Sequence, residues 1–82
     1  MTRHEIVTPF PGVFYRHPGP DSPPFVNEGD AVEAGQTVGL IEIMKQFNEV
    51  KASVAGVLSS FSVEDHAELE PGAVLAIVEV SE

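Results

Sequence analysis

The 82-residue sequence contains no cysteine and only four basic residues, against thirteen acidic ones. The absence of cysteine excludes disulfides, thiolate metal sites and cysteine nucleophiles, and it suits a reducing compartment such as the cytoplasm. A net charge of −9 argues against binding to nucleic acid or to an anionic membrane surface. No long apolar run follows the first residues, so the sequence predicts neither a signal peptide nor a transmembrane span. We therefore expect a soluble, cytoplasmic protein.

The length allows one modest hydrophobic core and is too short for two, so we expect residues 1–82 to form a single domain. Apolar residues come in short runs punctuated by seven glycines and seven prolines. No stretch keeps the apolar period of a helix for three turns. Many short strands separated by turns predict an all-β fold, either a sandwich or a flattened barrel.

The runs that favour strands are separated by a proline-rich loop at 16–24 and a polar stretch with two short turns at 64–72. The expected strands are residues 5–8, 13–15, 37–43, 47–52, 57–61 and 74–80, and residues 31–36 are expected to form a further short strand with its turn. Four glycines are expected in turns that need unusual backbone angles, namely Gly29, Gly35, Gly56 and Gly72. Four aromatic residues are expected to join the aliphatic side chains in the core: Phe10, Phe14, Phe47 and Phe61.

The chain also repeats itself. A shift of 37 residues places 32–35 over 69–72 and 38–43 over 75–80, and a shift of 44 places 11–14 over 55–58. The difference of seven residues between these shifts falls in the proline-rich loop. Two related halves predict a pseudo-twofold sandwich of two four-stranded sheets. The shift of 37 relates Lys45 to Glu82, so we expect Lys45 to lie opposite the chain termini.

Met44-Lys45 lies between two β-favouring runs and is predicted to form the tip of a hairpin that holds Lys45 in solvent. An exposed lysine ammonium stays protonated at neutral pH, and in that state it is a poor nucleophile. The pattern therefore favours an attachment point over a catalytic residue.

The tetrapeptide Ile43-Met44-Lys45-Gln46, with Glu42 before it, resembles the Ala-Met-Lys-Met attachment motif of biotinyl domains. The resemblance covers nearly the whole chain and is to the biotin carboxyl carrier proteins of the bacterial acetyl-CoA carboxylase type. Lipoyl domains usually have aspartate before the lysine, so Met44 favours biotin. Ile43 and Gln46 depart from the motif and alter the surface that a biotin ligase reads.

A second set of residues resembles the thumb of these carriers, a protruding loop beside the biotinyl hairpin that lipoyl domains lack. It comprises Pro9, Gly12, Phe14-Tyr15-Arg16, Pro18 and Pro20-Asp21. The resemblance implies that residues 16–24 contact the ureido ring of biotin, so the thumb candidates for cofactor binding are Arg16, His17, Pro18, Gly19, Pro20 and Asp21.

The resemblance implies a carrier that is not itself a catalyst. A biotin protein ligase would recognise Met44 and join biotin through an amide to Lys45. The chain would then carry carboxybiotin from a biotin carboxylase to a carboxyltransferase that acts on an acyl-CoA, most simply acetyl-CoA. Full-length members of the family also have an N-terminal extension and a Pro/Ala-rich linker, so the chain fits either a stand-alone carrier or an excised domain.

Two other interpretations stay open at this point: a lipoyl-type carrier, and an unmodified β-sandwich that serves as an interaction module. A metal site is not expected, because His4, His17 and His66 are far apart in the sequence and lack paired ligand spacing.

Overall fold

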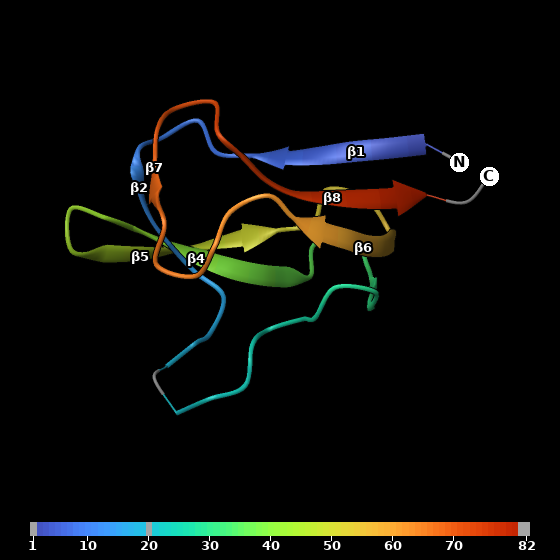
Figure 1. The fold of residues 1–82 in the computed structure, drawn as a ribbon, viewed down its shortest axis with the longest axis horizontal. Coiled ribbons are helices and arrows are strands. Elements are labelled where there is room, and N and C mark those ends of the chain that lie inside the picture. The colour runs from blue at the N-terminus through green and yellow to red at the C-terminus, as the bar shows by residue number, and fades with distance from the viewer. Residues whose placement is uncertain (1, 20, 81–82) are drawn as a thin grey trace.

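The computed structural model describes residues 2–19 and 21–80, and its regular elements are strands (Figure 1). No described segment forms a helix, and so none forms a helix long and apolar enough to cross a membrane. The strands are β1 (Thr2–Val7), β2 (Gly12–Tyr15), β3 (Ala31–Val32), β4 (Thr37–Ile43), β5 (Gln46–Lys51), β6 (Gly56–Phe61), β7 (Glu68–Leu69) and β8 (Val74–Val80).

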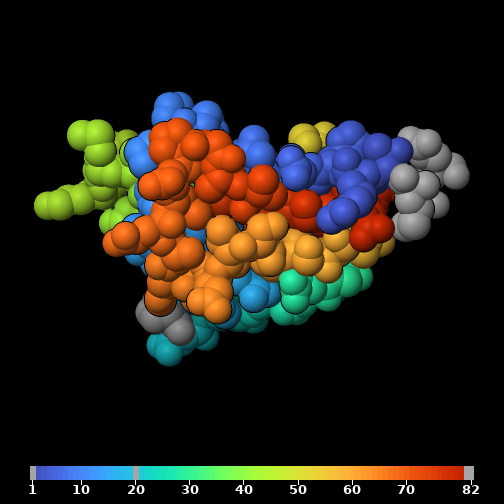
Figure 2. All heavy atoms as spheres, turned by 45° about the horizontal axis from the view of Figure 1, so that its top comes forward, coloured from blue at the N-terminus to red at the C-terminus, as the bar shows by residue number. Residues whose placement is uncertain are grey.

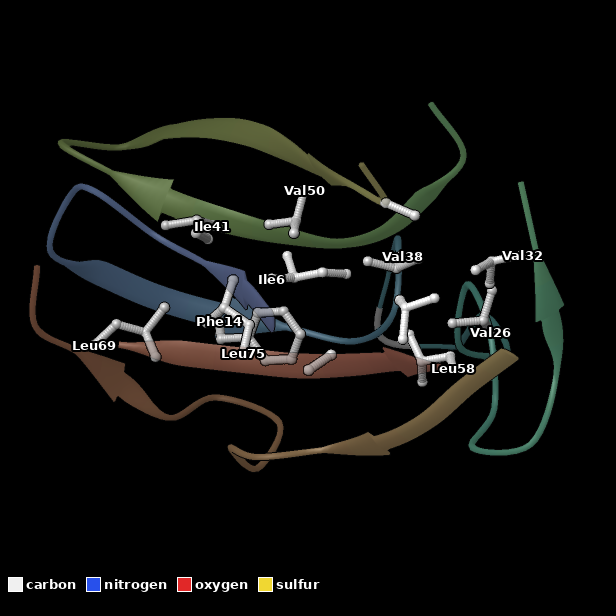
Figure 3. Packing of buried hydrophobic residues seen from close by; sticks show 13 residues of the cluster. Ile6, Phe14, Val26, Val32, Val38, Ile41, Val50, Leu58, Leu69 and Leu75 are labelled. Carbon is white, nitrogen blue, oxygen red and sulfur yellow. The ribbon is translucent and has the colours of Figure 1, made fainter. Parts of the chain in front are cut away.

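The strands pair antiparallel in two sheets of four. The first sheet has the order β1-β8-β6-β3, and the second has the order β5-β4-β2-β7. The core lies between the two sheets, as Figure 3 shows. The predicted all-β sandwich of two four-stranded sheets is confirmed.

The internal repeat is visible in the strand bounds. A shift of 44 residues carries β1 onto β5 and β2 onto the first part of β6, and a shift of 37 carries β3 onto β7 and β4 onto β8. Replacing each strand by its counterpart converts the order of the first sheet into that of the second. The pseudo-twofold relation is therefore confirmed. The relation also accounts for β7, which was not predicted because it lies in the polar stretch at 64–72. Leu69 of β7 is buried in the core, as its counterpart Val32 is.

Two of the four aromatic residues assigned to the core belong to it. Phe14 is fully buried, and Phe61 is half-buried against the core cluster. Phe10 and Phe47 were assigned wrongly, since they are 58% and 59% exposed. Phe10 lies in the turn between β1 and β2, whereas Phe47 pairs with Glu42 on the face of the second sheet that points away from the core.

The glycines of the turns have two separate structural roles. Gly29, Gly35 and Gly72 have positive φ, as predicted. Gly56 does not, and the prediction for it was wrong: its role is to let a neighbouring backbone approach, because a Cβ there would collide with the carbonyl oxygen of Glu79. Its counterpart Gly12 is held in the same way against the carbonyl oxygen of a residue in β4.

We predict that Gly12→Ala and Gly56→Ala each lower the free energy of unfolding by about 1–3 kcal/mol, because a packed backbone must move to make room for the added methyl group. Urea unfolding would measure the change. Gly19→Ala is the control, since a Cβ there would meet only the Ser22 Oγ at 3.5 Å, an ordinary contact. Wild-type stability in Gly56→Ala would contradict the proposed close approach.

The hairpin of β4 and β5 protrudes at one end of the molecule, and the start of β1 and the end of β8 lie at the other end (Figures 1 and 2). The molecule measures 39 Å along its longest axis. The predicted separation of Lys45 from the termini is thus observed for Thr2 and Val80; Glu82, the residue that the repeat relates to Lys45, lies outside the described residues.

Candidate functional site

The hairpin tip consists of two residues in a strained conformation. Ile43 pairs with Gln46, which leaves Met44 and Lys45 as a two-residue turn with φ values of 52° and 66°. Two consecutive positive φ values define a type I′ turn, whose twist matches the flanking strands but which normally uses Asn-Gly. The register of β4 and β5 therefore imposes the turn on a sequence that does not favour it locally.

The side chains at the tip point into solvent. Met44 is 92% exposed, so it has no place in the core, and Lys45 and Gln46 are exposed as well. Ile43 is half-buried and packs against the edge of the core. The tip therefore presents a flexible lysine arm on a fixed backbone, flanked on its solvent side by Met44 and Gln46.

The thumb, residues 16–24, is fixed at its base by Arg16. The Arg16 N–H donates to Asp65 Oδ1 at 2.8 Å, and the Arg16 carbonyl accepts from the Phe25 N–H at 2.9 Å. The guanidinium carbon lies 4.2 Å from the centre of the Phe61 ring, in cation–π contact. The bond between Arg16 and Phe25 thus joins the two ends of the loop. The Arg16 side chain points toward Phe61 at the edge of the core rather than toward the hairpin.

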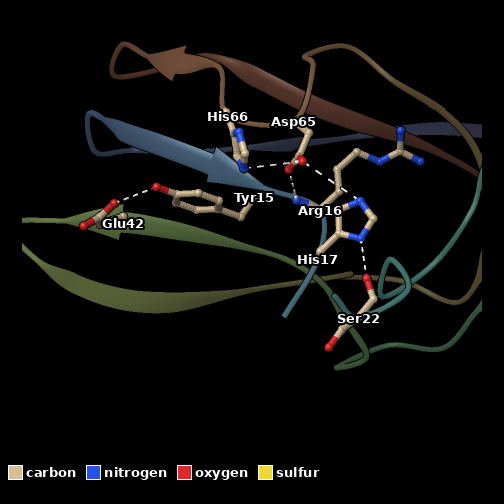
Figure 4. Close-up of polar contacts among 7 residues, drawn as sticks. All are labelled: Tyr15, Arg16, His17, Ser22, Glu42, Asp65 and His66. Carbon is tan, nitrogen blue, oxygen red and sulfur yellow. Dashed lines mark hydrogen bonds and ion pairs between the residues drawn. The ribbon is translucent and has the colours of Figure 1, made fainter. Parts of the chain in front are cut away.

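Within the thumb, His17 links the loop to itself and to the rest of the molecule. Its Nδ1 lies 2.8 Å from the Ser22 carbonyl oxygen, which accepts the hydrogen bond, and its Nε2 lies 4.0 Å from Asp65 Oδ2 (Figure 4). The Ser22 N–H in turn donates to the Gly19 carbonyl at 3.2 Å. The described part of the thumb is therefore an ordered loop.

A groove of about 640 Å³ lies between the thumb and the second sheet. This volume lies within the range of small-molecule sites. Its floor comes from the outer face of the sheet, one wall from the thumb and the other wall from the β6–β7 loop. The lining residues are Tyr15, Leu40 and Phe47 (floor), His17, Pro18 and Gly19 (thumb), and Asp65 and His66 (β6–β7 loop).

The structure brings only part of the predicted thumb set to this groove. His17, Pro18 and Gly19 line it, whereas Arg16 and the exposed Asp21 do not. Pro20 lies outside the described residues. Sequence reasoning missed the floor and the far wall. Strand alternation could have found the floor, because Tyr15 neighbours the buried Phe14 and must therefore face the opposite side of its strand.

Tyr15 is the central aromatic residue of the groove. Its hydroxyl donates to Glu42 Oε1 at 2.8 Å, and its ring lies 5.6 Å from the Phe47 ring and 5.0 Å from the His66 ring. The hydrogen bond to the Glu42 carboxylate raises the pKa of Tyr15, and loss of solvation and the negative charges of Glu42 and Asp65 act in the same direction.

The β6–β7 loop supplies the polar side of the groove. Asp65 Oδ2 lies 3.5 Å from His66 Nε2, and its other oxygen accepts the Arg16 N–H. Among the described residues, no group of three histidine or acidic side chains has a geometry that could hold a metal ion.

We predict that the phenol of Tyr15, the only tyrosine, titrates above the ordinary value of about 10. Ultraviolet absorbance of the phenolate would report it. Glu42→Gln should lower the pKa because the negative charge is lost, and Glu49→Gln is the control. Since the folded protein holds this proton more tightly than the unfolded chain, stability should fall as the pH rises above about 10. An unchanged pKa in Glu42→Gln would contradict the assignment.

The hairpin, the exposed lysine and the groove beside it define a carrier-type domain. Residues 4–78 match the family model of biotin/lipoyl domains, described as "Biotin-requiring enzyme". The chain belongs to this family, and the cofactor that goes with this assignment is biotin.

Several curated relatives are biotin carboxyl carrier proteins of acetyl-CoA carboxylase. The chloroplastic protein 2 of Arabidopsis thaliana is 48% identical over 60 residues, which cover 73% of this chain and 24% of the relative. The protein of Nostoc sp. is 41% identical over 80% of this chain and 36% of its own length. The protein of Haemophilus influenzae is 32% identical over 96% of this chain and 51% of its own length. The chain thus spans between a quarter and a half of these relatives.

A solved structure supports the fold. The crystal structure of the Kluyveromyces lactis urea carboxylase superposes with a TM-score of 0.80 at 25% identity, over 96% of this chain and 6% of that protein. The family assignment and the fold predicted from the sequence are therefore both confirmed.

Proposed function

We propose that the chain is the biotin carrier domain of an acyl-CoA carboxylase, with biotin joined through an amide to Lys45. The observation that carries the proposal is the position of Lys45, exposed on a two-residue turn at the protruding end of the molecule. The relatives favour acetyl-CoA as the compound that is carboxylated. In this function residues 1–82 act as a single, non-catalytic domain.

The residues at the site fit a carried ring. The lysine stem has four carbons and is flexible. Phe47, on the groove floor, is two residues after Lys45, which corresponds to about 7 Å along the chain at roughly 3.3 Å per residue. A ring on the lysine arm can therefore either rest on the Tyr15–Phe47 floor or extend from the tip toward a partner. When bound, biotin supplies a ureido nitrogen that takes up and releases a carboxyl group.

The contribution of the protein is positional. The fixed turn holds the start of the arm, and tethering raises the effective concentration of the ring at each partner's active site. The partners in this function are a biotin protein ligase, a biotin carboxylase and a carboxyltransferase, in the cytoplasm and without nucleic acid or membrane contacts. The exposure of Met44 and Gln46 supports recognition of these two residues by the ligase, and Ile43 is less accessible.

We predict that co-expression with a biotin ligase adds one amide-linked biotin to the wild-type chain and none to Lys45→Arg, because arginine keeps the charge and cannot form the amide. Intact-mass spectrometry would measure this. Lys51→Arg, at the other lysine, is the matched control and should be modified like the wild type. An unmodified wild-type mass would refute the proposal, and an increment that requires a lipoate ligase would favour a lipoyl carrier instead.

We predict that Met44→Asp slows biotinylation by about tenfold, which corresponds to about 1.4 kcal/mol of transition-state binding, while leaving the free energy of unfolding within about 0.5 kcal/mol of the wild type. The side chain is 92% exposed and has little packing to lose. Ala34→Asp adds the same charge to an exposed turn at the other end of β4 and is the control. Loss of folding in Met44→Asp would show that the side chain has a structural role.

A further inference from the structure

The β6–β7 loop contains a residue whose backbone conformation is unfavourable for its type. His66 has a φ of 68°. It occupies the third position of the turn 64–67, which is closed by the Ala67 N–H donating to the Glu64 carbonyl at 3.1 Å. Turns that need positive φ at this position normally have glycine there, since a Cβ makes the conformation costly.

The hydrogen bonding of the backbone at position 66 does not require a histidine there. The His66 N–H donates to the Phe14 carbonyl at 2.6 Å, and glycine would provide the same donor without the strain. The side chain is 69% exposed, so it contributes little to the core. Strain that local packing does not require is found most often at binding and catalytic sites.

The imidazole is placed where a ligand in the groove would meet it. Its ring stands edge-on to Tyr15 at an interplanar angle of 67°, and the Tyr15 ring also contacts that of Phe47. The three rings form a continuous surface from the hairpin to the β6–β7 loop (Figure 4 shows Tyr15 and His66). Asp65 holds His66 through Nε2, and Nδ1 makes no hydrogen bond to any described residue.

We propose that His66 contacts the cofactor ring when the ring lies in the groove, stacking against it beside Tyr15 and offering Nδ1 to its polar edge. This inference rests on the proposed attachment of biotin to Lys45. A ligand that contacts His66 in this way needs both a flat face and hydrogen-bonding groups. The ureido ring of biotin has both. His66 is thus the counterpart, on the far wall, of the thumb residues Pro18 and Gly19.

The test uses one substitution that should raise stability and weaken the contact with biotin. His66→Gly should raise the melting temperature of the unmodified chain by about 4 °C, because glycine relieves the strain. The same variant should lose at least half of the change in Tyr15 fluorescence that biotinylation produces in the wild type. Tyr15 is the only tyrosine and tryptophan is absent, so the emission reports the groove alone. A purely structural role would change the melting temperature and leave the biotin-dependent signal intact.

Two further variants control the experiment. His66→Asn keeps a residue that tolerates positive φ but removes the ring, and it should also lose the biotin-dependent signal. His4→Asn, on β1 and away from the groove, should retain it. Amide shifts of Tyr15, His17 and Gly19 on biotinylation provide a second readout in each protein.

The outcomes separate the two proposals. A wild-type chain that takes up no biotin refutes the proposed function. A biotinylated wild type whose groove amides do not shift, or a His66→Gly variant with the wild-type biotin-dependent signal, overturns the role of His66 and leaves the carrier function standing.

Discussion

The burial of Phe14 is the interaction on which both the core and the groove depend. The side chain is fully buried between the sheets, and its ring packs so closely under Gly39 that a Cβ there would overlap it. Its N–H donates to Ala67 and its carbonyl accepts from His66, so one residue also fastens the β6–β7 loop to the second sheet. Because side chains alternate along a strand, burying Phe14 turns Tyr15 outward. The floor of the groove and its far wall are thus both positioned from the core.

Backbone strain in the described residues is concentrated at the hairpin tip and at the far wall of the groove. The residues other than glycine with positive φ are Met44, Lys45 and His66, two at the hairpin tip and one at the groove wall. Each costs on the order of 1–2 kcal/mol relative to an unstrained residue. The paired register of β4 and β5 compensates for the first two, and the hydrogen bonds of Phe14 compensate for the third. A sequence selected for stability alone would place glycine or asparagine there, so the tertiary structure overrides local preference at these three positions.

The sequence predicted what depends on local pattern and on the repeat. Short strands follow from alternation and turn residues, the two-residue tip follows from its place between two β-favouring runs, and the pseudo-twofold pairing follows from internal similarity. The groove does not, because it joins segments that are distant in the sequence: Tyr15 and Phe47 meet across strands, and His66 reaches them from another loop. Phe47 was assigned to the core because an aromatic residue in a strand usually is buried. Its pairing with Glu42, which neighbours the buried Ile41, turns it outward instead.

The thumb and the β6–β7 loop act as one unit through Asp65. This carboxylate accepts the Arg16 N–H and lies near a histidine from each segment, so displacing either segment leaves a charge without its partners. The thumb ends are tied at Arg16 and Phe25, and the buried Val26 follows immediately, so only a short loop is left to order. Closing so short a loop costs little entropy. The fold itself therefore forms the groove, and a ligand that binds there need not supply the cost of ordering the thumb.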